Sequence, residues 1–89
     1  MTIVGVGWYK KDQWEELRRI SSDKEALEAT WEEWAQNAER TLAEMIKKGF
    51  MMQKVSVDVH ELDLWCRTEK RACDGAARAV YITSKLRSK

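Results

Sequence analysis

Residues 22–49 read SDKEALEATWEEWAQNAERTLAEMIKKG, and this stretch predicts one long amphipathic helix around which the rest of the chain is organised. Ser22 and Glu25 match a capping box, in which two side chains satisfy free backbone N–H groups at a helix start. Gly49 suits the left-handed residue that ends many helices. Apolar residues recur at steps of three and four, as one helical face requires: Leu27, Trp31, Trp34, Ala38, Leu42, Met45 and Ile46. We therefore expect a helix from Ser22 to Gly49 with both indoles hidden beneath a small sheet.

Two shorter segments, 3–9 and 53–59, predict β-strands. The first is β-branched or aromatic apart from Gly5 and Gly7, so both of its faces are mostly apolar. In the second, valines alternate with polar residues and share one face, which we expect to lie on the long helix. Two helices are predicted between the strands. If the chain reverses direction at each connection from strand to helix to helix to strand, the strands are antiparallel; a parallel crossover is the alternative.

Three further helices are predicted, over 13–20, over 60–71 and from residue 76 onward. Capping boxes begin the first two, at Asp12 with Glu15 and at Asp58 with Glu61, and Asp74 precedes the third as a turn or an N-cap. The sequence thus predicts one α+β domain over residues 1–89. Its two-stranded sheet packs on a long central helix, in the order β-α-α-β-α-α.

The overall charge excludes a general attraction to nucleic acid or to acidic surfaces. Sixteen Lys and Arg oppose fifteen Asp and Glu, which leaves a net charge of +1. Acidic residues gather in the long helix and basic residues in the C-terminal third. We expect both groups of charged side chains to be exposed to solvent.

Cys66 and Cys73 are predicted to be free thiols that face the core. If both were helical, seven residues of spacing would separate their Cα atoms by about 10 Å, too far for a disulfide. The sequence holds neither a hydrophobic run long enough to cross a bilayer nor a signal-peptide pattern at its start. We therefore expect no membrane partner and a cytoplasmic location.

His60 is the single histidine and the centre of one alternative, a small enzyme. It lies near Asp58, Glu61 and Asp63, and neighbouring carboxylates favour the protonated imidazole that acid–base catalysis uses. No nucleophile falls within its reach on a helix, and its spacing to the two cysteines does not match a zinc site. We therefore predict no catalytic, metal or cofactor-binding residues, and no enzymatic activity.

A protein-interaction surface is the function that we expect from the sequence. Alternate glycines in the first strand leave a shallow channel, and tryptophans beside thin elements are candidate interface anchors. The predicted surface consists of Gly5, Gly7, Trp8, Tyr9 and Trp14. Because a two-stranded sheet has unpaired edges, we also expect a homodimer that joins two sheets, whereas the identity of any other protein partner is unknown.

A nucleic-acid-associated accessory protein is the other alternative. The basic residues on both sides of the last turn could contact phosphates without reading sequence, because the helix that follows is rich in alanine. The predicted contacts are Arg67, Lys70, Arg71, Arg78, Lys85 and Arg87.

Residues 65–79 contain the pairs Trp65-Cys66 and Asp74-Gly75, followed by an alanine-rich run. This segment resembles parts of small bacterial and phage proteins. The resemblance implies a bacterial or phage origin and carries no activity and no site.

Overall fold

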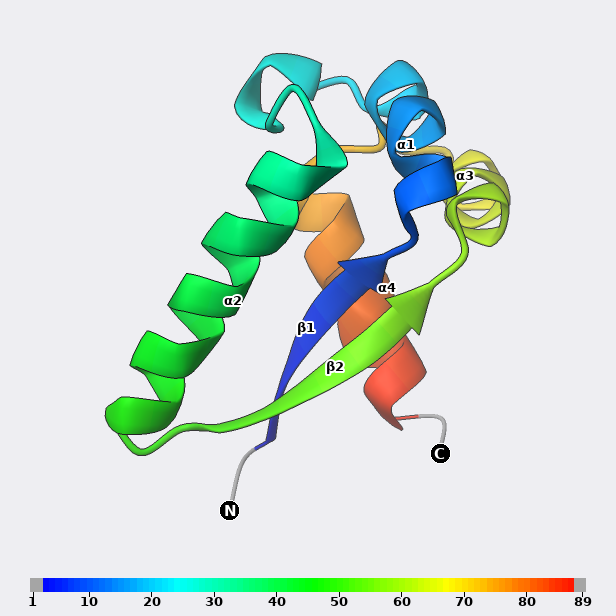
Figure 1. Ribbon diagram of the computed structural model, residues 1–89. Coiled ribbons are helices and arrows are strands. Elements are labelled where there is room, and N and C mark those ends of the chain that lie inside the picture. Colours follow the sequence, from blue (N-terminus) through cyan, green and yellow to red (C-terminus); the bar gives the residue numbers. More distant parts are fainter. Residues whose placement is uncertain (1–2, 88–89) are drawn as a thin grey trace.

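The computed structural model describes residues 3–87 (Figure 1). Its elements are β1 (Ile3–Tyr9), η1 (Lys11–Gln13), α1 (Trp14–Ile20), η2 (Lys24–Ala26), α2 (Trp31–Lys47), β2 (Met51–Val57), α3 (Val59–Thr68) and α4 (Gly75–Arg87). The α+β class and the two-stranded sheet are confirmed. The element order differs from the predicted one, because two short 3₁₀ helices, η1 and η2, precede α1 and α2.

The two strands are parallel, so the predicted antiparallel pairing is wrong. Ile3 is opposite Met51 at one end of the sheet, and Tyr9 is opposite Val57 at the other. The prediction counted α1 as a reversal of chain direction. However, α1 has seven residues and lies beyond the end of the strands, so only α2 runs back along the sheet (Figure 1). One full reversal between two strands makes them parallel.

The sheet lies between two helices. On one face, α4 packs closely on β1, because the side chains of Ile82 and Leu86 reach the space above Gly5 and Gly7. A Cβ atom at Gly7 would lie 2.5 Å from Ile82 Cδ1, so glycine permits this close approach. On the other face, Trp34 of α2 contacts Trp8 of β1, with ring centroids 4.8 Å apart.

The long helix begins at Trp31 and not at Ser22, which corrects the predicted start. Ser22 is held elsewhere, because its backbone N–H donates to the carbonyl of Cys73 at 2.9 Å. Thr30 is the N-cap, and its hydroxyl accepts a hydrogen bond from the backbone N–H of Glu33 at 3.2 Å. Thr30 and Glu33 are themselves spaced as a capping box, so the sequence held two competing start signals. The predicted end is confirmed, since Gly49 has a φ of 97°.

Two of the other three caps are confirmed. Asp58 accepts hydrogen bonds from the N–H groups of His60 and Glu61 at the start of α3, and Asp74 accepts one from Ala77 at the start of α4. The box predicted at Asp12 is wrong, because η1 occupies that position and α1 has no side-chain cap.

The core is built from α1, α3, α4 and the ends of the strands, and α2 contributes no buried residue to it. Trp14 is 2% exposed and Leu17 is fully buried, whereas Trp31 and Trp34 are only half-buried. Trp31 and Trp34 pack against this core but are not fully buried, so the expectation that they are hidden is confirmed only in part. The fully buried tryptophan of the core is Trp14, whose indole N–H donates to the carbonyl of Glu28 at 3.1 Å.

The valine face of β2 also packs elsewhere than predicted. Val55 lies on the same face as Gly5 and Gly7, and Val57 joins the core with Ala77 and Tyr81 of α4. These valines therefore pack on α4 and not on the long helix. The third predicted member, Val59, lies in α3, because β2 ends at Val57.

We predict that Trp14→Ala lowers the free energy of unfolding by about 3–5 kcal/mol, because it removes a fully buried indole and leaves a cavity. The measurement is chemical denaturation followed by circular dichroism. Leu64→Ala is the matched control, since Leu64 is 66% exposed and its truncation should change stability by less than about 0.5 kcal/mol. Equal losses in the two variants would contradict the core described here.

Candidate interaction site

The edge of β1 that faces away from β2 exposes backbone hydrogen-bonding groups. We call the Tyr9 end of this edge its upper end and the Ile3 end its lower end. At the upper end the indole N–H of Trp31 donates to the carbonyl of Tyr9 at 2.9 Å, so this carbonyl points away from β2. In a strand the N–H and C=O of one residue point to the same side, and the direction alternates along the chain. The backbone groups of Ile3, Gly5 and Gly7 therefore also point outward.

A groove runs along this exposed edge, and we call it the edge groove. Its volume is about 730 Å³. The backbone side of the groove is Ile3, Gly5 and Gly7, and α4 forms one wall. The wall residues of α4 are Ala79, Ile82, Thr83, Leu86 and Arg87. The edge groove is thus mainly apolar along its walls, with Thr83, Arg87 and Arg78 as polar lining residues beside the exposed strand backbone.

An aromatic cluster closes the upper end of the edge groove. Trp34 is its centre, with ring centroids 4.8 Å from Trp8, 5.3 Å from Tyr9 and 5.2 Å from Trp14. Lys54 of β2 lies over the Trp8 ring, with its Nζ 3.9 Å from the centroid. Only the part of the edge between Ile3 and Gly7 is left open.

Apolar side chains surround the lower end of the sheet. Ile3 and Met51 are opposite each other in the two strands, and they are 44% and 46% exposed. Ile46 at the end of α2 and Phe50 in the turn that follows are also about half exposed. Large apolar side chains that gather at one place on the surface are typical of a protein contact.

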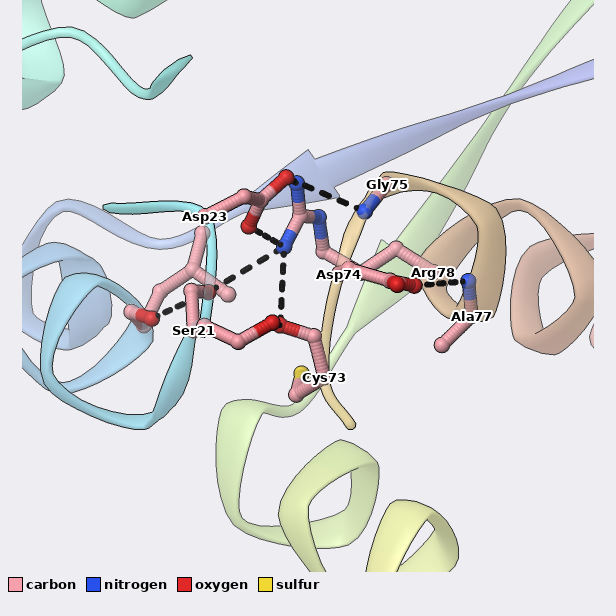
Figure 2. Close-up of polar contacts among 9 residues, drawn as sticks. Ser21, Asp23, Cys73, Asp74, Gly75, Ala77 and Arg78 are labelled. Carbon is pink, nitrogen blue, oxygen red and sulfur yellow. Dashed lines mark hydrogen bonds and ion pairs between the residues drawn. The ribbon is translucent and has the colours of Figure 1, made fainter. Parts of the chain in front are cut away.

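The Arg78 guanidinium lies at the upper end of the edge groove, within a buried polar network (Figure 2). It donates to both carboxylate oxygens of Asp23, at 2.9 and 2.8 Å, and to the Ser21 hydroxyl at 3.1 Å. Asp23 also accepts a hydrogen bond from the Gly75 N–H. The hydrogen bond from Arg78 lowers the pKa of the Asp23 carboxyl. Asp23 and Arg78 are 55 positions apart, so no local sequence signal predicts this pair.

The five residues predicted as an interaction surface are placed in different environments. Tyr9 and Trp14 are buried and belong to the core, and burial raises the pKa of Tyr9 to about 12. Their side chains therefore offer no free surface. Trp8 is half-buried against Trp34, and Gly5 and Gly7 present backbone to the edge groove. The surface that remains consists of a strand edge and its apolar walls, without exposed indoles as anchors.

Three of the six basic residues predicted to contact phosphate are paired with carboxylates. Arg78 is buried against Asp23, and both Arg67 and Lys85 form ion pairs, with Asp63 at 3.2 Å and Glu61 at 3.3 Å. Arg71 lies beside the Trp65 ring, and Lys70 occupies the turn after α3 with a φ of 56°. Carboxylates thus neutralise half of the predicted set.

The two cysteines are free thiols and are buried. Cys73 lies in the loop before α4, so the helical separation that was used to exclude a disulfide does not apply. Burial, together with a hydrogen bond to Cys66, raises the pKa of the Cys73 thiol to about 12. His60 is exposed at the start of α3, and residues 3–87 contain no group of three acidic, His or Cys side chains placed to hold a metal ion.

Comparisons of the chain with protein-family models, with curated proteins and with solved structures gave no match. No helix within the described range 3–87 is long and apolar enough to cross a membrane.

We predict that the Arg78–Asp23 pair stabilises the protein above about pH 5 and loses this effect in acid. The folded-state pKa of Asp23 is lowered, so its contribution is complete above the unfolded-state value near 3.9 and disappears as the pH falls through the folded value. The free energy of unfolding should be measured against pH for the wild type and Asp23→Asn. Their difference should be constant from pH 5 to 7 and shrink below about pH 4.

Arg78→Ala should cost about 2–4 kcal/mol at pH 7. This value is below the cost for a fully buried pair, because the Asp23 side chain remains 29% exposed. An undiminished difference between wild type and Asp23→Asn at pH 3 would contradict this role for the ion pair.

We predict that the native protein reacts slowly with a thiol reagent such as 5,5′-dithiobis(2-nitrobenzoic acid) at pH 8. At a pKa of about 12, roughly one Cys73 thiol in ten thousand is ionised at that pH. In addition, both sulfur-bearing residues are shielded from the reagent. The unfolded protein should release two equivalents within minutes. Fast release from the native protein would show that the thiols are accessible.

Proposed function

We propose that this chain is a small non-enzymatic protein-interaction module, and that it binds a protein partner along the edge groove. The observation that carries this proposal is the open segment of β1 between Ile3 and Gly7. The backbone N–H and C=O groups of Ile3, Gly5 and Gly7 face outward between mainly apolar walls, which is the arrangement that strand addition uses. Main-chain hydrogen bonds would hold the partner segment, and the walls would receive its alternate side chains.

The surface of α2 supports the same proposal. The apolar stripe of this helix faces the sheet, yet none of its residues is buried. A second groove, lined by Val6, Leu42 and Met52, lies on the α2 side of β1. An added strand would therefore find an apolar wall on each of its two faces. The predicted nucleic-acid alternative lacks comparable support, since half of its basic residues are already paired with carboxylates.

A second copy of the chain is the partner that we propose first, so the protein is a homodimer. A two-stranded sheet is marginally stable alone, and joining two sheets would pair one exposed edge of each. We further propose a cytoplasmic location, in keeping with two free thiols that are not joined as a disulfide.

We predict that sedimentation equilibrium shows a mass near twice 10.4 kDa at tens to hundreds of micromolar, because the open edge is paired in the dimer. The apparent mass should fall towards that of one chain on dilution to the low micromolar range. A mass of one chain throughout the high micromolar range would remove the homodimer.

A further inference from the structure

We infer that the homodimer forms through the exposed edge of β1, with two β1 strands antiparallel about a two-fold axis at Gly5. The result is one sheet of four strands, β2-β1-β1-β2. This inference rests on the proposed function and adds to it the edge, the direction and the register of the contact.

The outward backbone groups select the register. Gly5 and Gly7 point their N–H and C=O groups into the edge groove, and antiparallel pairs form hydrogen bonds between residues of this orientation. With Gly5 opposite its own copy, Ile3 lies opposite the partner's Gly7, and Val4 lies opposite the partner's Val6. The overlap covers residues 3–7 only. It therefore avoids Trp8 and Tyr9, where Trp31 and Trp34 close the edge.

The occupant of the edge groove must be apolar on both faces, because α4 covers one side of β1 and α2 the other. β1 itself meets this requirement, with Ile3 on one face and Val4 and Val6 on the other. β2 does not, since Lys54 and Ser56 occupy one of its faces. A second β1 strand is thus the complement that this chain can itself supply.

The outer face of α4 fits the same two-fold axis. Ala76, Ala79, Val80 and Thr83 form an exposed face of small side chains on this helix, and Ala79 and Thr83 also line the edge groove. Pairing at β1 would bring the two α4 helices alongside each other, antiparallel and roughly 8–10 Å apart, which is the spacing of packed helices. Small side chains permit that approach.

The charges on both flanking helices are complementary in this arrangement. α4 is preceded by Asp74 and ends at Arg87, whereas α2 carries Glu32 and Glu33 in its first turn and Lys47 in its last. When two α4 helices meet in opposite directions, Asp74 just before one helix faces Arg87 at the end of the other, and two α2 helices that met in this way would bring Glu32 and Glu33 towards Lys47.

A standard interface takes about 800 Å² from each partner, which is about an eighth of the 6051 Å² of accessible surface on this chain. Ile3 of β1 and Val80 of α4, 44% and 47% exposed, are among the residues that would contribute to it.

Two variants, each with one cysteine added to the buried native pair Cys66 and Cys73, test the register. Val4→Cys and Val6→Cys chains are mixed, exchanged by dilution and reconcentration, and oxidised with oxidised glutathione. In the proposed register the two added cysteines face each other as a non-hydrogen-bonded pair, with Cα atoms about 4.5 Å apart, within disulfide range. Non-reducing electrophoresis should show a cross-linked dimer at least tenfold faster in the mixture than in either variant alone.

A pair of matched lysine variants tests the α4 contact by sedimentation equilibrium. Val80→Lys should weaken dimerisation at least tenfold, whereas Leu64→Lys on α3 should leave it unchanged. Both positions are exposed, at 47% and 66%, so the fold should tolerate either change. Circular dichroism checks that it does.

The outcomes separate this inference from the proposed function. A wild-type dimer without preferential cross-linking in the mixture overturns the β1 register and leaves the proposed homodimer standing. A wild-type dimer that both lysine variants leave intact overturns the α4 contact and with it this interface. A wild-type monomer at high micromolar concentration overturns both the inference and the homodimer.

Discussion

The bidentate ion pair between Arg78 and Asp23 is the contact on which the arrangement of this chain depends. It ties the start of α4 to the segment between α1 and α2, and it does so next to the buried Ser21 hydroxyl and the carbonyl of Cys73. Asp23 is held by Arg78 and by the Gly75 N–H, and the chain after it forms only the three-residue 3₁₀ helix η2 before α2. α2 begins at Trp31, after the Thr30 cap.

That constraint explains why the interior lies at one end of the molecule. The carboxyl ends of the strands, α1, α3 and the start of α4 meet around Trp14, Leu17 and Leu62, where side chains are almost fully buried. At the other end, α2 and the strands separate around residues that are about half exposed. A chain of 89 residues can bury only part of its apolar surface, so a well-packed end leaves a less covered one. The edge groove is the consequence of this division.

The two glycines of β1 matter both for the packing of the sheet and for the proposed contact. Gly5 and Gly7 allow α4 to approach one face of β1, and the same absence of side chains leaves the strand backbone accessible at its edge. A residue with a Cβ at Gly7 would require Ile82 to move, and it would also narrow the edge groove. One local feature of the sequence therefore serves both the packing of the monomer and the proposed contact.

Local patterns in the sequence determined the class of the fold and many of its details. The Asp58 and Asp74 caps, the end of α2 at Gly49 and the existence of both strands follow from short-range chemistry, which operates within a few residues. Tertiary structure alone decided three features. They are the parallel direction of the strands, the start of α2 at Trp31, and the deeper burial of Trp14 compared with Trp31 and Trp34. Each of these depends on contacts between residues far apart in the chain, above all Asp23 with Arg78, and a capping pattern or a helical period carries no information about such partners.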